Sequence, residues 1–196
     1  MIETHIAYGR DIARWVPSLA RLRMRVFREF PYLYDGSEAY EAQYLQTYTD
    51  CEDAMAVIYT DHGEPVGATT GLPMRAETDA FRAPLEAAGI DTQNLFYCGE
   101  SVLLPPWRGR GLYRGFFEYR EQHARSLGLS SACFCAVVRP DNHPLQPTDY
   151  QPLDAVWMHY GYRLLPDLCA YYDWKDIDRP DQSAHPMRYW MRSLND

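Results

Sequence analysis

Positive charge and flexible backbone gather in one short segment of the chain, residues 108–114. It contains, in order, Arg108, Gly109, Arg110, Gly111, Leu112, Tyr113 and Arg114. A helical pattern begins near Leu112, so unpaired N–H groups and the positive end of a helix dipole are expected here. Glycine admits a ligand close to the backbone, and arginines at a helix start oppose the dipole unless an anion binds. The segment predicts a polyanion site, although three solvated arginines on a polar turn would give the same sequence.

The spacing within this segment excludes two common nucleotide sites. The Walker pattern requires a lysine after its glycines, and none follows here. The dinucleotide pattern G-x-G-x-x-G fits from Gly109 until its sixth position, which is Arg114. The segment also lies in mid-chain, behind a hairpin pattern, rather than at the start of a doubly wound sheet. Nucleotide hydrolysis and dinucleotide redox chemistry are therefore not expected.

A strand, a helix and a second strand must position this segment. The apolar run 94–104 predicts a strand, which Pro105 and Pro106 end because proline cannot donate a ladder hydrogen bond. The pattern of 112–128 predicts a helix closed by a glycine, and 131–138 predicts another strand. A strand–helix–strand unit of this kind implies a parallel pair of strands.

The rest of the chain alternates between the two kinds of element. Its patterns predict strands at 5–12, 169–177 and 186–194, helices at 14–30, 38–50, 78–90 and 152–162, and a hairpin over 54–74. Antiparallel strands early in the chain and a parallel pair later indicate a mixed-sheet α/β or α+β domain. The proline-rich segment 139–152 is either a linker or a surface loop, and we favour a loop within a single domain spanning 1–196.

Composition limits the partners and the compartment. A formal net charge of −8 argues against nucleic acid or an anionic membrane surface as the partner of the whole protein. The five cysteines do not form a disulfide framework, so a reducing, cytoplasmic setting is expected. The first residues lack the pattern of a secretory signal, and no run approaches the roughly 20 apolar residues that span a bilayer.

The segment LLPPWRGRGLY, residues 103–113, resembles the acyl-coenzyme A loop of the GNAT superfamily of N-acetyltransferases. That loop has Arg or Gln, two residues, Gly, one residue, then Gly or Ala. Arg108 and Gly111 fill the first two fixed positions, and Tyr113 stands where a small residue is usual. The order of elements is similar to the family's as far as about Trp174. The resemblance implies a mixed, strongly twisted sheet of six to seven strands flanked by helices, in which strands 95–104 and 131–138 splay apart.

The resemblance also implies a co-substrate, acetyl-coenzyme A. Its pantetheine arm would pair with the exposed backbone of Ser101, Val102 and Leu103, as an added strand does. Its pyrophosphate would lie on the N–H groups of Arg108, Gly109, Arg110, Gly111, Leu112, Tyr113 and Arg114.

Acyl transfer to an amine needs a group that removes a proton from the ammonium form. Glu100 is the candidate base, because its carboxylate lies in an apolar strand beside the expected cleft; an ordinary paired strand glutamate is the alternative. Many family members place a tyrosine, the usual acid, four residues before the glycine that corresponds to Gly161, and here that position is Trp157. Tyr160 is our candidate acid, with His159, Tyr162 or water as alternatives.

The expected function is transfer of an acetyl group from acetyl-coenzyme A to a primary amine of a small acceptor. An acidic mouth would favour a cationic amine, and the family architecture would place the tyrosine-rich segment 29–44 over the acceptor side. The alternatives are a non-catalytic acyl-coenzyme A sensor and an interaction domain without a cofactor. A metal site built from Cys133 and Cys135 with a histidine is not expected, since Cys-x-x-Cys spacing is absent. Exposed closing strands are compatible with a homodimer.

Overall fold

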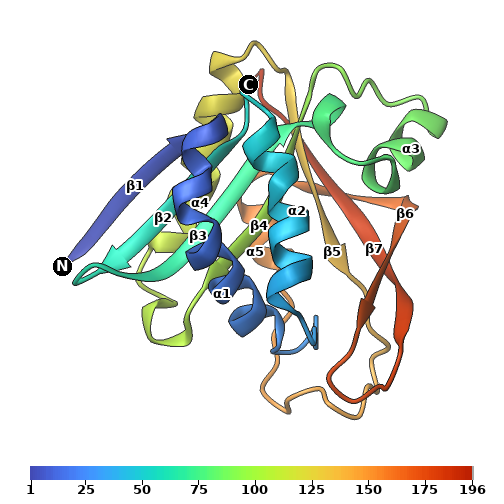
Figure 1. Ribbon diagram of the computed structural model, residues 1–196. Helices are drawn as coiled ribbons and strands as arrows, with labels where there is room; N and C mark the ends of the chain where they lie inside the picture. The colour runs from blue at the N-terminus through green and yellow to red at the C-terminus, as the bar shows by residue number, and fades with distance from the viewer. Residues whose placement is uncertain (196) are drawn as a thin grey trace.

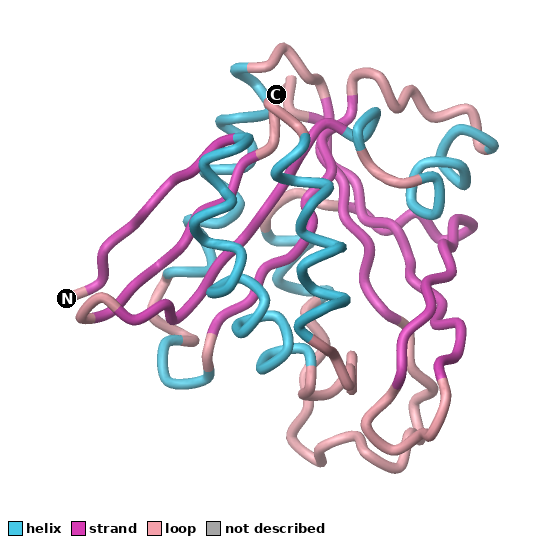
Figure 2. The backbone as a smooth tube through the Cα atoms, in the orientation of Figure 1, coloured by secondary structure: helices cyan, strands magenta, loops and turns pink. Residues whose placement is uncertain are grey.

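The computed structural model describes residues 1–195, and in this part of the chain seven strands form one sheet in the order β1-β2-β3-β4-β5-β7-β6 (Figures 1 and 2). The strands are β1 (Ile2–Tyr8), β2 (Met55–Asp61), β3 (Glu64–Pro73), β4 (Leu95–Leu103), β5 (Ser131–Val137), β6 (Arg163–Lys175) and β7 (Gln182–Ser193). β4 and β5 are parallel, and every other neighbouring pair is antiparallel. The predicted mixed sheet is confirmed.

Helices cover both faces of this sheet. They are α1 (Val16–Phe27), α2 (Glu38–Asp50), α3 (Asp79–Ala87), α4 (Leu112–Ser126) and α5 (Asp154–His159), with short 3-10 turns at Gly9–Trp15, Met74–Ala76 and Pro105–Trp107. In Figure 1, α1 and α2 lie side by side in front of the sheet and α4 lies behind it. Among residues 1–195, no helix combines the length and the apolar character needed to cross a membrane.

The strongest sequence patterns gave the most accurate boundaries. Ser37 caps α2 by accepting a hydrogen bond from the Tyr40 N–H at 3.3 Å, which places the helix start as predicted. Several other boundaries differ, among them the end of the first strand and the start of β6. The first strand ends at Tyr8, because Gly9 turns the chain with a positive φ of 47°. β6 begins at Arg163 rather than 169, since a strand at the sheet edge tolerates Pro166 next to a register shift.

The parallel strands β4 and β5 stay together over a short distance only. Three pairs join them, Leu95 with Ser131, Phe96 with Ala132 and Tyr97 with Cys133. Beyond Tyr97 they diverge, so the predicted splay is confirmed and the edge of β4 that faces β5 is left without a partner strand.

A β-bulge interrupts β4 at the point where the splay begins. Thr69 of β3 pairs with Ser101, whereas Gly71 pairs with Cys98, so Gly99 and Glu100 together oppose a single residue of β3. The extra residue changes which face the following side chains point to. Glu100 contacts α1 and α2 on one face of the sheet, and Ser101 contacts α4 on the other.

Candidate active site

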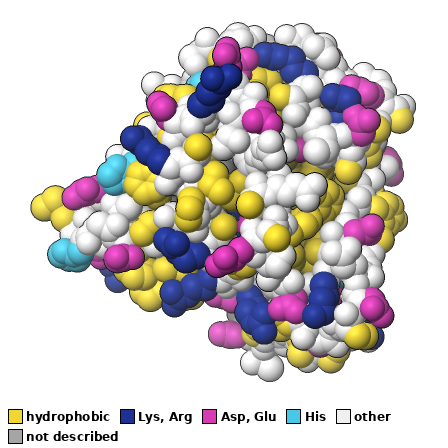
Figure 3. Space-filling view, in the orientation of Figure 1, with side chains coloured by type: hydrophobic (Ala, Val, Ile, Leu, Met, Phe, Trp, Pro, Cys, Tyr) yellow, Lys and Arg dark blue, Asp and Glu magenta, His cyan; other side chains and the backbone are white. Residues whose placement is uncertain are grey.

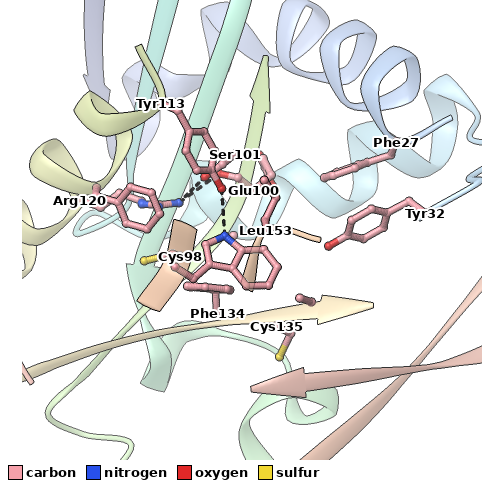
Figure 4. Close-up of a pocket in the computed structure, with 14 residues that line it drawn as sticks. Phe27, Tyr32, Cys98, Glu100, Ser101, Tyr113, Arg120, Phe134, Cys135 and Leu153 are labelled. Carbon is pink, nitrogen blue, oxygen red and sulfur yellow. Dashed lines mark hydrogen bonds between the residues drawn. The ribbon is translucent and has the colours of Figure 1, made fainter. Parts of the chain in front are cut away.

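The gap between β4 and β5 opens into two adjoining pockets. The first, called here the α4-side pocket, lies between the two strands and helices α4 and α5 (Figure 4). Its lining includes Glu100, Ser101, Tyr113, Arg120, Phe134 and Trp157. Two flanking helices thus place polar and aromatic side chains directly over the unpaired edge of β4.

The second, called here the α2-side pocket, lies between α1, α2 and β6 and is aromatic. Tyr32, Tyr34, Tyr40, Tyr44, Tyr97 and Tyr172 line it. Among residues 1–195, Arg23 is the only charged side chain in its lining. In Figure 3, hydrophobic side chains show on the surface between α2 and the β6–β7 hairpin. The two pockets share Phe27, Tyr32, Gly99 and Cys135, so they meet where the strands part.

Glu100 is buried at the junction of these pockets and is held by α1. Its Oε2 accepts a hydrogen bond from Arg23 Nη1 at 2.6 Å and one from the Tyr44 hydroxyl at 3.4 Å. The same guanidinium donates through Nε to Glu41 Oε2 at 2.5 Å. Among residues 1–195, no donor reaches Glu100 Oε1. Burial raises the pKa of the Glu100 carboxyl, and the charge of Arg23 opposes that rise.

A third buried carboxyl, Glu77, lies in the same environment. One oxygen accepts a hydrogen bond from the Thr78 N–H at 2.8 Å, and the other finds no donor within the described chain. Burial raises the pKa of Glu77 to about 7, and the negative charge of Glu100 adds to this rise. Around the single cation Arg23, the α1–α2 face therefore carries more carboxyls than that cation neutralises.

On the opposite face of β4, Arg120 of α4 is buried but has hydroxyl partners instead of carboxylates. Its Nη1 donates to Ser101 Oγ at 2.7 Å and to Thr69 Oγ1 at 2.8 Å. Its guanidinium also lies 5.1 Å from the centre of the Phe117 ring. Across residues 1–195, no carboxylate comes within ion-pair distance of Arg120. A buried cation without a counter-ion is costly, so it marks this pocket as a place where negative charge would be stabilised.

Tyr113 crosses the α4-side pocket and meets Trp157. The indole Nε1 donates to the Tyr113 hydroxyl at 3.2 Å (Figure 4). Burial raises the pKa of the Tyr113 phenol, while the Trp157 hydrogen bond, the Arg120 charge and Ser101 act to lower it. Sequence reasoning identified Tyr113 as a departure from the family's loop and as one of the backbone N–H groups for the pyrophosphate, but not as a side chain in the cleft. Its packing in the cleft depends on a contact between residues 44 positions apart.

The glycine-arginine segment forms an open turn at the start of α4. Gly109 and Gly111 have positive φ values of 70° and 81°, and a Cβ at either would meet no atom within 4 Å. Gly111 is the N-cap of α4 and supplies no side-chain acceptor, which leaves the first N–H groups of the helix open to a ligand. Arg108 is tied back, through Nε to the Leu103 carbonyl at 2.8 Å and through Nη1 to Glu29 at 2.9 Å. Arg114 pairs with Glu118.

The unpaired edge of β4 presents backbone groups at two of the three residues expected there. The Leu104 N–H donates to the Val66 carbonyl, and Val102 stands opposite Ala68 in the β3–β4 ladder. Because alternate residues of an antiparallel strand face the partner, Val102 directs its backbone groups to β3. Ser101 and Leu103 direct theirs to the edge that β5 leaves free.

The three acid candidates, at the end of α5 and in the turn after it, lie outside both pocket linings. The Tyr160 ring stacks on Phe117 with centroids 4.2 Å apart, and its carbonyl accepts from Arg192. Tyr162 is fully buried, and His159 is exposed. The structure therefore brings Glu100 and Ser101 together with Tyr113 and Tyr44 at the pockets, and it does not bring Tyr160 there.

The cysteines and histidines are dispersed. Cys133 and Cys135 are buried in β5, while His123 bonds to the Asp53 carbonyl and His143 packs near Phe30. No group of three or more metal-ligating side chains occurs within residues 1–195. Burial raises the pKa of the Cys135 thiol, which disfavours its nucleophilic thiolate form.

Comparison with solved structures identifies the architecture. An acetyltransferase of the GNAT family from Staphylococcus aureus Mu50 is 7% identical, with 98% of this chain and 100% of that chain covered and a TM-score of 0.59. This chain has the GNAT acetyltransferase fold. The ribosomal-protein-S18-alanine N-acetyltransferase from Escherichia coli is 9% identical, with coverages of 99% and 96% and a TM-score of 0.58. An aminoglycoside 6'-N-acetyltransferase complexed with coenzyme A is 14% identical, with 98% of both chains covered and a TM-score of 0.59.

These likenesses concern the fold, because all three identities are far below the range at which a shared activity follows. No family model matches the chain, and no curated protein matches it. Within the GNAT fold, the open turn at α4, the splayed strands and the two pockets are the features on which a function must be argued.

Proposed function

We propose that this protein is an acyltransferase that moves an acetyl group from acetyl-coenzyme A to a primary amine of a small acceptor. The observation that carries the proposal is the splay of β4 from β5, which has an open glycine turn at one end and a buried carboxylate at the other. Five free thiols support a reducing, cytoplasmic location.

The turn and the free strand edge suit the two halves of coenzyme A. The positive-φ glycines Gly109 and Gly111 leave open space above the first N–H groups of α4, as a pyrophosphate requires. An extended arm along β4 would find the backbone groups of Ser101 and the Leu103 N–H on the free edge, in the manner of an added strand, while Arg108 already donates to the Leu103 carbonyl. The exposed Arg110 adds positive charge at the same turn.

Glu100 is the base in this proposal. An acceptor ammonium must lose a proton before its nitrogen can attack a thioester. Glu100 Oε2 is occupied by Arg23 and Tyr44, whereas Oε1 makes no hydrogen bond within the described residues. Because Oε1 is also buried, it would accept that proton through a water that reaches it from the pocket. Burial, which raises the pKa of this carboxyl, brings it closer to the value that suits a base near neutral pH.

The acceptor occupies the α2-side pocket in this proposal. Tyrosine and phenylalanine rings dominate its lining, and no carboxylate of the described residues is part of it. The acidic mouth expected from the net charge is therefore not what surrounds the acceptor. Aromatic walls favour a small amine that carries an apolar or aromatic group, with its ammonium end toward Glu100.

A non-catalytic acyl-coenzyme A sensor is the second candidate, and Trp157 is the observation in its favour. Trp157 stands where the resemblance places a tyrosine, and indole cannot serve as a proton donor to a thiolate. A sensor would bind acyl-coenzyme A tightly without releasing its thiol in the presence of any amine.

Two measurements test the proposal. Coenzyme A should raise the melting temperature of the protein, and acetyl-coenzyme A should release free thiol in a screen over primary amines with apolar substituents. Glu100→Gln should lower kcat about 100-fold, and the exposed Glu64→Gln serves as the matched control. Thiol release that is equal in Glu100→Gln and wild type would remove Glu100 as the base. Binding of acetyl-coenzyme A without thiol release for any of the amines would favour the sensor.

A further inference from the structure

The two residues that depart most from the family's pattern, Tyr113 and Trp157, are in direct contact. Trp157 Nε1 donates to the Tyr113 hydroxyl at 3.2 Å, and both side chains line the α4-side pocket. In Figure 4 the phenol of Tyr113 reaches from the start of α4 toward Ser101 and the indole. Tyr113 thus places a hydroxyl beside Trp157, the position at which the family usually has its acidic tyrosine.

Hydrogen-bond donors and positive charge surround this phenol oxygen. Trp157 is a donor only, so its indole fixes the orientation of the hydroxyl from one side. Ser101 lies on another side, and Arg120 donates to Ser101 Oγ at 2.7 Å. Because Arg120 is buried without a carboxylate in the described chain, its charge is available to a phenolate formed beside it. The surroundings stabilise the anion that remains after Tyr113 gives up its proton.

The pocket also places this phenol along the path expected for the arm of coenzyme A. The arm would begin at Gly109 and Gly111 and run along the free edge of β4 past Leu103 and Ser101. Tyr113 lines the same pocket as Ser101 and Gly99, where the two pockets meet. Burial raises the pKa of the Tyr113 phenol above its ordinary value, so the phenol keeps its proton at neutral pH.

We propose that Tyr113 is a catalytic residue whose phenol protonates the departing sulfur of coenzyme A, with Trp157 and Ser101 as positioning residues. This inference rests on the proposed function. The acceptor nitrogen bonds to the carbonyl carbon, and the C–S bond breaks with its electron pair going to sulfur. Sulfur takes the phenolic proton. The phenolate regains a proton that the attacking nitrogen has released to Glu100 or water, which leaves an amide, a free thiol and the original phenol.

A set of four binding measurements tests the contact between the Tyr113 phenol and the sulfur of coenzyme A, and it needs no acceptor amine. Calorimetry measures the Kd of coenzyme A and of desulfo-coenzyme A, which lacks the sulfur, for wild type and Tyr113→Phe. A hydrogen bond between phenol and sulfur should give wild type about a 2- to 5-fold preference for coenzyme A. Tyr113→Phe should lose that preference, and Tyr119→Phe, on the same helix but outside both pockets, should keep it.

The second test measures kcat after the hydroxyl is removed from position 113 and then returned at position 157. Thiol release from acetyl-coenzyme A is followed with 2-phenylethylamine and with water alone as acceptor. Tyr113→Phe should lower kcat about 100-fold with KM nearly unchanged. The double variant Tyr113→Phe with Trp157→Tyr, which returns the hydroxyl to α5, should recover at least about 10-fold. If Tyr113→Phe does not fold, Trp157→Phe should still lower kcat about 3-fold by removing the donor.

The outcomes separate this inference from the function on which it rests. Wild type that does not bind coenzyme A would remove the proposed function, and the role of Tyr113 with it. Wild type that binds coenzyme A, but with the same preference over desulfo-coenzyme A in Tyr113→Phe, would remove the role of Tyr113 alone. Undiminished kcat in Tyr113→Phe would overturn it as well.

Discussion

Arg23 and Arg120 are both buried arginines beside β4, one on each face of the sheet, yet their surroundings differ. Arg23 donates to two carboxylates, Glu41 and Glu100. Arg120 donates to two hydroxyls and to no carboxylate within residues 1–195. The first charge is more than neutralised, and the second is left unbalanced. We therefore expect Arg23 to stabilise the folded state and hold the proposed base, and Arg120 to stabilise negative charge that forms in the α4-side pocket.

The two arginines also differ in what their removal would leave behind. Without Arg23, two buried carboxylates would lose their cation. Without Arg120, two hydroxyls would lose one donor, and they remain within 3.3 Å of each other. Breaking a buried ion pair costs far more than removing a buried ion that has no partner.

Replacement of Arg23 has the largest expected effect. Arg23→Met should lower the free energy of unfolding by about 3–5 kcal/mol, because Glu41 and Glu100 would remain buried without a cation. Urea titration followed by circular dichroism measures this loss. The triple variant that adds Glu41→Gln and Glu100→Gln should recover much of it. A loss below about 1 kcal/mol in Arg23→Met would place the pair among weak surface interactions instead.

Glu77 sharpens the comparison through its dependence on pH. Its folded pKa of about 7 lies above the ordinary value of 4.5, so the folded state holds a proton that the unfolded chain has released. Its contribution to stability is full below pH 4.5 and is lost as pH rises through 7. Glu77→Gln should match wild type at pH 4 and exceed its free energy of unfolding at pH 8 by up to about 3 kcal/mol. Equal stability at both values would mean that Glu77 is ionised when folded.

Replacement of Arg120 should separate activity from stability. Arg120→Met should change the free energy of unfolding by less than about 1 kcal/mol, since it also removes the cost of an unbalanced buried charge. The same variant should lower kcat at least about 10-fold, because the phenol of Tyr113 loses its supporting charge. Urea titration and thiol release measure the two effects. A loss of stability as large as that in Arg23→Met would erase the distinction between the two faces.

The smallest expected effect concerns an exposed arginine. Arg108 pairs with Glu29 at 2.9 Å, and both side chains are 44% exposed. Glu29→Gln should change the free energy of unfolding by less than about 0.5 kcal/mol and should tighten coenzyme A binding about 2-fold by freeing Arg108. Calorimetry at low salt measures the affinity. Weaker binding would indicate that Glu29 orients Arg108 instead of restraining it.

Local patterns predicted most of the fold. Ser37 and the residues after it defined α2, and two prolines with the following glycines marked the end of β4 and the start of α4. These elements depend on capping, turns and periodicity within a few residues. The start of β6 was missed because Arg163 pairs with Met191, far along the chain, and a proline interrupts the strand.

The site was predictable only in part, because its chemistry depends on distant contacts. Glu100 was identified from its apolar strand, but its partner Arg23 lies 77 residues away. A basic residue four positions after Leu19, on the apolar face of α1, was a signal that was available. Tyr113 and Trp157 were each noted as departures, and only the folded chain shows that they meet.

The bulge at Gly99 and Glu100 sets which side of the sheet each following residue of β4 serves. Neighbouring residues of a strand point to opposite faces, and the inserted residue shifts that alternation so that Glu100 lies on the α1–α2 side and Ser101 on the α4 side. The proposed base, Glu100, and Ser101, which would position the proposed acid, are then held by the same stretch of backbone. Their spacing would be maintained while the surrounding helices shift to admit and release ligands.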